Sequence, residues 1–218
     1  AGGADQIALI QELKSRGCNT VILVDYFENP PAKRFADSHI IASTLDVEEV
    51  KRIALSERVD LICTACTDQA LLTVAKVSEE PSLPCYIPYQ TALNVTNKSY
   101  MKKVMKECDI PTSQYIILDH FDRNALKGFC YPLVVKPVDC NSSKGVKKVE
   151  TEEELQLALD SAISYSRTCT AIIEEFKLGR EISADFYIEG ENVKYLCATS
   201  SAKIKNTHSF TIMQSYYP

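Results

Sequence analysis

Short apolar runs alternate with helical segments in the first half of the chain, and this alternation limits the possible folds more than any other feature. Thr20–Val24 and Val59–Cys63 are the apolar runs typical of strands buried on both faces of a parallel sheet. Ser38–Ala42 predicts a shorter strand. Asp46 can cap a helix that reaches about Arg58, and a second helix is predicted from Thr67 to about Ser78. The alternation predicts a parallel sheet covered by helices on both faces.

The chain opens on Ala1-Gly-Gly-Ala4, a glycine turn that runs into a helical pattern starting at Ile7. In a Rossmann-like α/β unit such a turn follows a strand, so we expect the chain to start just after its first strand. Ligands of parallel sheets bind at the carboxyl ends of the strands. Candidate substrate contacts at that edge are Gly2, Gly3, Asp25 and Asp68. The glycine pattern is an incomplete dinucleotide fingerprint, so a Rossmann oxidoreductase is the weaker alternative.

Composition indicates a soluble globular chain and excludes several kinds of partner. Lys and Arg total 24 against 29 Asp and Glu, a net charge of −5, so bulk positive charge does not attract nucleic acid or an anionic membrane. No apolar run approaches the roughly 20 residues that cross a bilayer, and the first residues do not resemble a signal peptide. We therefore expect a cytoplasmic protein with neither a nucleic-acid nor a membrane partner.

Nine irregularly spaced cysteines without a secretion signal indicate free thiols in a reducing compartment. Cys63-Thr-Ala-Cys66 has the CxxC spacing of redox and zinc sites. There is no second CxxC, and the three histidines lie elsewhere in the sequence. We interpret this pair as small residues at the end of a buried strand, and we predict no metal ligands within the chain.

The pattern changes after a proline-bearing stretch that ends near residue 94. A helix is predicted from Asn97 to about Cys108, and the Thr151–Glu154 capping box opens another. Predicted strands lie at 115–118, 131–137, 146–149, 171–176, 181–188 and 193–198. Glu189–Asn192 predicts a hairpin turn between the last two strands. We therefore predict a Rossmann-like parallel α/β unit at 1–94 and an α+β unit with an antiparallel sheet at 95–218.

Lys136 lies inside an apolar strand, where a charged side chain is costly without a partner. The neighbouring loop, Asp139-Cys-Asn-Ser-Ser-Lys-Gly145, offers hydroxyls, backbone N–H groups and a lysine that can wrap phosphate oxygens. Lys136 would then neutralise the phosphate charge. The loop is not a Walker loop, and a lysine reaching solvent from a strand end is the alternative.

Two adjacent carboxylates follow an apolar strand in Glu174-Glu-Phe-Lys177. The segment Gly179-Arg-Glu181 comes shortly after them. Adjacent carboxylates are usually a solvated strand end. A strand exit can also present its backbone groups to the edge of an adenine ring. Glu181 would then face hydroxyl groups such as those of a ribose.

In this order the segments resemble the ATP-grasp superfamily. The resemblance covers nearly the whole chain and runs through Asn97–Lys102, Asp109–Pro111, Tyr131–Gly145, Ile173–Phe176 and Gly179–Glu181. It implies that 1–94 is the substrate-side domain that precedes an ATP-grasp domain. It also implies that 95–218 is the ATP-grasp domain, with an incomplete C-terminal lobe.

The resemblance places ATP between two α+β lobes. The ATP-binding residues that it implies are Lys98, Lys136, Ser142, Ser143, Gly145, Glu174, Glu175, Phe176, Lys177 and Glu181. Lys98 and Lys136 would contact the phosphates from two sides, and the loop ending at Gly145 would close over the β- and γ-phosphates. Backbone groups of Glu175 and Lys177 would hold the adenine, and Glu181 would bind the ribose.

The resemblance also implies a reaction. Members of the superfamily mostly phosphorylate a carboxylate with ATP, after which an amine or similar nucleophile attacks the acyl phosphate. We therefore expect an ATP-dependent, ADP-forming carboxylate–amine or carboxylate–thiol ligase for small molecules, with ATP and Mg²⁺ as cofactors. The resemblance also allows a homodimer. A carboxylate kinase, a carbamoyl-phosphate-synthetase-like subunit and a non-catalytic ATP-binding module are the alternatives.

One departure concerns the metal. In the superfamily the magnesium ligands lie well beyond the ribose-binding glutamate, whereas residues 200–218 contain no Asp or Glu. We therefore expect the magnesium ligands beyond Pro218, and we expect the chain as given to be inactive by itself.

Overall fold

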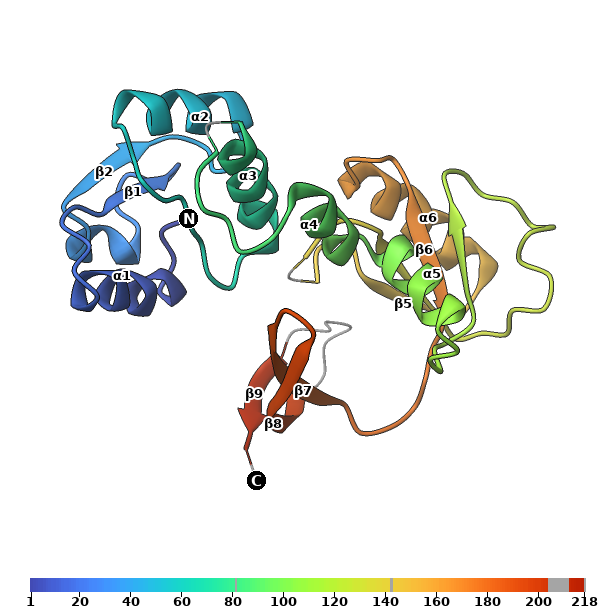
Figure 1. Cartoon of the computed structure of the whole chain (residues 1–218). Helices are drawn as coiled ribbons and strands as arrows, with labels where there is room; N and C mark the ends of the chain where they lie inside the picture. Colours follow the sequence, from blue (N-terminus) through green and yellow to red (C-terminus); the bar gives the residue numbers. More distant parts are fainter. Residues whose placement is uncertain (81, 142, 204–211, 218) are drawn as a thin grey trace. The chain divides into compact units, whose positions relative to one another are not determined.

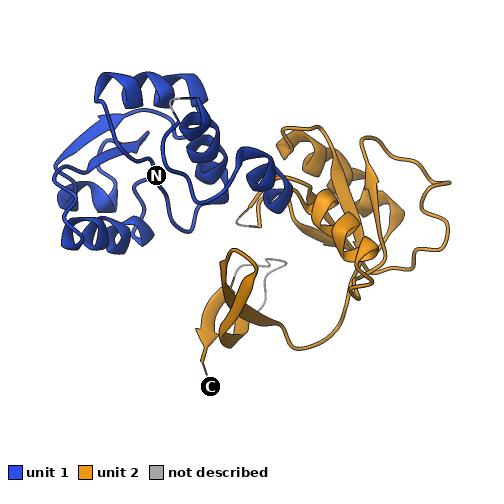
Figure 2. Ribbon diagram, in the orientation of Figure 1, with its two compact units in different colours: residues 1–96 blue, residues 97–218 orange. Residues whose placement is uncertain are grey.

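Two units make up the chain, residues 1–96 and residues 97–218 (Figure 2). The computed structural model describes residues 1–80, 82–141, 143–203 and 212–217. Buried apolar clusters lie inside each unit. The α/β fold class predicted from the sequence is confirmed.

The first unit has a parallel pair of strands among its helices (Figure 1). Its elements are α1 (Asp5–Ser15), β1 (Ile22–Asp25), the 3-10 helix η1 (Pro31–Phe35), β2 (Ser38–Ile41), α2 (Val47–Ser56), α3 (Asp68–Glu79) and α4 (Tyr89–Thr96). β1 and β2 pair in parallel, as predicted. The Asp46 side chain accepts a hydrogen bond from the Glu49 N–H at 3.0 Å and caps α2.

The predicted strand over Val59–Cys63 is wrong, because this segment has no strand pairing in the structure. Ile62 still packs against the apolar cluster that contains buried Val77. The segment is only partly buried, with Leu61 exposed. A strand also needs a neighbouring backbone to pair with. A side chain holds the following loop instead: Gln6 Nε2 donates to the Ala65 carbonyl at 2.5 Å.

The second unit contains two antiparallel sheets. Its elements are α5 (Lys98–Glu107), β3 (Tyr115–Leu118), β4 (Leu133–Pro137), β5 (Lys147–Val149), α6 (Glu152–Tyr165), β6 (Ala171–Glu175), β7 (Ile182–Glu189), β8 (Asn192–Lys203) and β9 (Ile212–Tyr216). The strand order is β3-β6-β4-β5 in one sheet and β7-β8-β9 in the other. This arrangement confirms the predicted α+β character.

The main core of the second unit lies between α6 and the four-stranded sheet. Its fully buried members are Leu133, Val135, Val149, Leu155, Ala158, Leu159, Ala162, Ala171 and Ile173. The predicted capping box begins the helix: the Glu154 N–H donates to Thr151 Oγ1, and Glu154 Oε2 accepts from the Glu150 N–H. Burial of this core positions β4 and β6, which carry Lys136 and Glu174.

The three-stranded sheet is amphipathic and exposes its apolar face. Ile182, Phe186 and Ile188 alternate with polar residues along β7, so they share one face. Their partners on β8 include Tyr195 opposite Phe186 and Val193 opposite Ile188. All of these side chains are exposed.

Within the described ranges, no helix combines the length and the apolar character needed to span a bilayer.

Candidate functional site

Two lysines and one glutamate form the central cluster of the second unit. Lys102 projects from α5 and Lys136 from β4, and both pair with the Glu174 carboxylate on β6. Lys102 Nζ lies 2.5 Å from Glu174 Oε1, and Lys136 Nζ pairs with Oε2. The Ser113 hydroxyl donates to Glu174 Oε1 at 3.2 Å. Three elements distant in sequence thus meet at one carboxylate.

The cluster is mostly withdrawn from water. The exposed fractions of the side chains are 7% for Glu174, 13% for Lys102 and 25% for Lys136. Burial alone opposes the charged form of Glu174. The positive charges of Lys136 and Lys102 outweigh burial, so the pKa of Glu174 lies below its ordinary value. Glu174 is therefore ionised at neutral pH, and the cluster carries one net positive charge.

Lys102 was missed in the sequence reasoning, which selected Lys98 to act with Lys136. The structure directs Lys98 elsewhere: its Nζ donates to the Cys140 carbonyl at 2.5 Å, and its N–H donates to the Val138 carbonyl at 2.8 Å. Lys98 thus contacts the start of the glycine loop. Lys102 lies four residues after Lys98 and therefore on the same face of the helix. This spacing was the signal in the sequence that could have indicated Lys102.

The loop between β4 and β5 makes two turns with left-handed residues. Ser143 has φ +58° and Gly145 has φ +69°. A Cβ on Gly145 would lie 2.9 Å from both Pro137 Cγ and Tyr165 Cδ2, so only glycine fits this position without displacement. Ser142, another predicted residue of this loop, lies outside the described residues.

At the end of β6 the backbone is partly committed to the sheet. The Glu175 N–H donates to the Gln114 carbonyl at 3.0 Å, and the Phe176 N–H donates to the Pro132 carbonyl at 3.2 Å. Since proline has no N–H, Pro132 cannot return a hydrogen bond to Phe176. The Glu175 N–H is thus already engaged, while the Phe176 carbonyl receives no hydrogen bond from Pro132.

Side chains around this strand end bring further charge. Lys148 Nζ lies 5.0 Å from the centre of the Phe176 ring, a cation–π arrangement. Lys177 Nζ pairs with Glu175 Oε2 at 2.6 Å.

Glu181 precedes β7 and pairs with Lys203 on β8 at 2.5 Å. Among the described residues, no ion pair joins Glu181 to Lys102 or Lys136.

The candidate substrate residues of the first unit fall into two groups. Asp25 is buried; its Oδ2 accepts from the Gly2 N–H at 2.6 Å and its Oδ1 from the Phe27 N–H at 2.8 Å. Its carboxylate therefore holds the glycine turn. Gly3 has open space beside it, and Asp68 is exposed at the start of α3.

The chain's cysteines are free thiols. Burial raises the pKa of Cys63, which is the opposite of what a reactive thiolate needs. Across residues 1–80, 82–141, 143–203 and 212–217, no group of three or more His, Cys, Asp or Glu side chains could hold a metal ion.

A parallel α/β unit, then an antiparallel sheet with paired lysines beside a glycine-bearing loop, defines an ATP-grasp protein. Residues 96–206 match the family "Phosphoribosylglycinamide synthetase, ATP-grasp (A) domain", and the chain belongs to this family.

Known relatives and solved structures agree with this assignment. The formate-dependent phosphoribosylglycinamide formyltransferase of Maridesulfovibrio salexigens is 28% identical over 184 residues, covering 83% of this chain and 46% of the relative. Two solved structures share the fold. The ADP complex of PurK, N5-carboxyaminoimidazole ribonucleotide synthetase, has a TM-score of 0.73 at 18% identity, covering 98% of this chain and 55% of that one. The L-amino acid ligase of Bacillus licheniformis has a TM-score of 0.72 at 22% identity, covering 95% and 50%. The chain thus spans about half the length of these proteins.

Proposed function

We propose that this chain binds ATP as part of an ATP-dependent, ADP-forming enzyme that activates a small carboxylate for attack by an amine. The Lys102–Glu174–Lys136 cluster beside the Gly145 loop carries this proposal. Phosphoryl transfer depends mainly on positioning and on neutralising phosphate charge, and partly buried lysines held by a carboxylate can supply both.

In this proposal Lys102 and Lys136 bind phosphate oxygens. Glu174 positions their two ammonium groups before ATP binds. A third cation, Lys98, keeps the start of the loop in place through the Cys140 carbonyl. Backbone N–H groups and hydroxyls of the loop, Ser142 and Ser143 among them, bind the β- and γ-phosphates.

The adenine would lie at the end of β6. The Phe176 carbonyl can accept a hydrogen bond from the adenine amino group, since Pro132 leaves that carbonyl without a returning N–H. The Glu175 N–H is already bound to the Gln114 carbonyl, so the backbone contacts that we propose are the carbonyls of Glu175 and Phe176 and the backbone of Lys177. Glu181 remains the proposed ribose ligand.

Magnesium is proposed only as the ion that accompanies ATP. In the described part of the chain no acidic cluster fits a metal ion, so we assign no step of the reaction to a metal ligand of this chain.

The names of the relatives indicate the substrate class. The formyltransferases are described as formate-dependent and as acting on phosphoribosylglycinamide, and the structural neighbours include an amino acid ligase. A small carboxylate and an amine therefore suit the proposal best. The substrate side would lie in the first unit, at Gly2, Gly3, Asp25 and Asp68.

Calorimetric titration with Mg·ATP tests the proposal. We expect binding by the unsubstituted chain, a loss of at least about tenfold in affinity for Lys136→Ala, and no change for Lys127→Ala, an exposed lysine of the same unit. Absence of binding by the unsubstituted chain, or equal binding by all three proteins, would contradict the proposal.

A further inference from the structure

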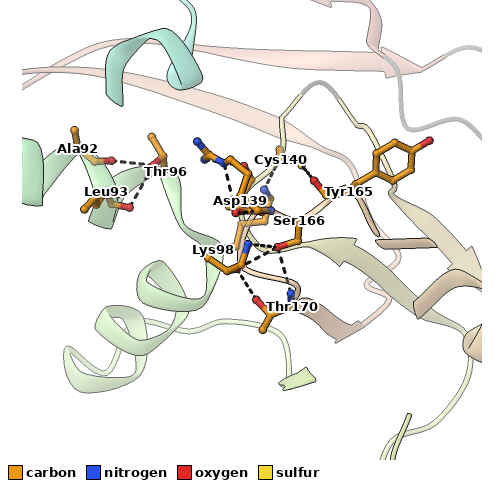
Figure 3. A network of polar contacts seen from close by, with 11 residues as sticks. Ala92, Leu93, Thr96, Lys98, Asp139, Cys140, Tyr165, Ser166 and Thr170 are labelled. Atoms are coloured by element: carbon orange, nitrogen blue, oxygen red, sulfur yellow. Dashed lines mark hydrogen bonds and ion pairs between the residues drawn. The ribbon is translucent and has the colours of Figure 1, made fainter. Parts of the chain in front are cut away.

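The segment that enters the glycine loop, Val138–Cys140, is held from two sides (Figure 3). Lys98 binds the Val138 and Cys140 carbonyls from the start of α5. On the opposite side the Cys140 thiol donates to the Tyr165 carbonyl at 3.0 Å, at the end of α6. The backbone that connects β4 to the loop is therefore held in place by these hydrogen bonds.

Asp139 lies at the centre of this segment, with 5% of its side chain exposed. Its Oδ2 accepts from the Arg167 N–H at 3.1 Å and lies 3.6 Å from Arg167 Nε. The Arg167 Nη2 in turn donates to the Asp139 carbonyl at 3.4 Å. The buried carboxylate is thus tied to Arg167 by one backbone hydrogen bond and by an ion pair with a half-exposed guanidinium.

The partner of Asp139 is itself well ordered by hydrogen bonds. In the turn between α6 and β6, Ser166 Oγ accepts from the N–H groups of Thr168 at 3.2 Å and Thr170 at 3.3 Å. The Val138 N–H donates to the Thr170 carbonyl at 3.4 Å. Asp139 thus ties the loop to a turn that has hydrogen bonds of its own.

The returning limb of the loop meets the same region. Gly145 packs so closely against Pro137 and Tyr165 that a Cβ would lie 2.9 Å from each. The entry and the exit of the loop therefore both contact Tyr165 at the end of α6.

We infer that Asp139 is a positioning residue for nucleotide phosphates. It fixes the position of the backbone where the loop leaves β4. Through the loop it thereby determines where the hydroxyls and N–H groups meet the β- and γ-phosphates. This inference rests on the proposed ATP binding. Nothing in it requires Asp139 to touch the nucleotide.

The test separates phosphate positioning from general stability by comparing nucleotides. AMP, ADP and Mg·ATP are titrated into the unsubstituted chain, Asp139→Ala, Asp139→Asn and the control Asp160→Ala, an exposed acid on α6. We expect Asp139→Ala to weaken ADP and ATP binding about tenfold while AMP changes less than about twofold. Asp139→Asn keeps an acceptor for the Arg167 N–H, so we expect a smaller loss of roughly threefold for ADP and ATP. Asp160→Ala should match the unsubstituted chain.

The outcomes distinguish this inference from the proposed function. If the unsubstituted chain does not bind ATP, both are overturned. If it binds ATP but Asp139→Ala weakens AMP as much as ATP, or weakens neither, the positioning role alone is overturned. Circular dichroism shows whether Asp139→Ala is folded. If it is not, the folded Asp139→Asn variant provides the test, and unchanged affinity of that variant for ADP and ATP overturns the inference.

Discussion

Glu174 shows how one carboxylate can hold two cations in a largely dry site. Its two lysines come from α5 and β4, and the Ser113 hydroxyl satisfies Oε1 further. Removing the negative charge would leave two partly buried ammonium groups close to each other without a counter-ion. Such a loss costs far more than the loss of an exposed pair, which is worth about 0–1 kcal/mol.

We therefore expect Glu174→Gln to lower the free energy of unfolding of the second unit by about 3 kcal/mol. Because the pKa of Glu174 is lowered in the folded state, its contribution is present above its ordinary pKa of 4.5 and is lost as the pH falls through the lower folded value. Urea denaturation at pH 7 and across the acid range measures both effects. Exposed Glu107→Gln on α5 is the control. A Glu174→Gln difference that stays constant down to the most acidic pH would contradict the assignment.

Lys102 and its neighbour Lys103 offer a matched pair on one helix. Lys102 is bound to Glu174, whereas Lys103 is exposed and lies 3.8 Å from Glu107. We expect Lys102→Ala to weaken Mg·ATP binding about tenfold, because a phosphate ligand is lost, and Lys103→Ala to leave it unchanged. Calorimetry decides between them. Equal losses would mean that charge on α5 acts only at long range.

At the scale of an element, the β4–β5 loop depends on the close approach at Gly145. Gly145 and Gly128 both have positive φ, but only Gly145 has neighbours where a Cβ would be. Comparing these two glycines separates the cost of the backbone conformation from the cost of the contact.

We expect Gly128→Ala to lower stability by about 1–2 kcal/mol, the cost of a left-handed L-residue, without changing ATP affinity. Gly145→Ala should cost more, because Pro137 and Tyr165 must move, and should also weaken ATP binding by displacing the loop. Thermal unfolding and calorimetry measure the two effects. Intact ATP affinity in a folded Gly145→Ala variant would show that the loop does not bind phosphate.

Helices were predictable where their signals are local. The helix predicted from Asn97 begins there, where Asn97 accepts from the Ser99 N–H at 2.9 Å, and the predicted Thr151 capping box opens α6. In contrast, the sequence shows α4 only as the end of a proline-bearing stretch. It is helical because buried Ala92 packs against α3, and that contact is invisible in local sequence.

At the scale of the whole molecule, the described elements differ greatly in burial. β4 and β6 contribute fully buried Val135 and Ile173 to the main core, whereas every described side chain of β7 is exposed. Local opening requires little energy where few apolar contacts are lost.

We therefore expect amides of β4 and β6 to exchange with deuterium far more slowly than those of β7 and β8. Exchange read by mass spectrometry over time measures the difference. Equal protection would mean that the apolar face of Ile182, Phe186 and Ile188 is covered in solution. If the protection of β7 and β8 also rises with protein concentration, self-association is the cause.

The sequence by itself determined the α/β class, most element positions and the presence of a lysine in an apolar strand, because periodicity, caps and turn residues act over a few positions. Only the tertiary structure decided that Lys102 rather than Lys98 joins Lys136, that Asp139 binds the Arg167 turn, and that Val59–Cys63 has no strand partner. Each of these depends on which segments distant in the chain share a burial site, and the desolvation of a charge or of a backbone group is settled only by the neighbours that packing supplies.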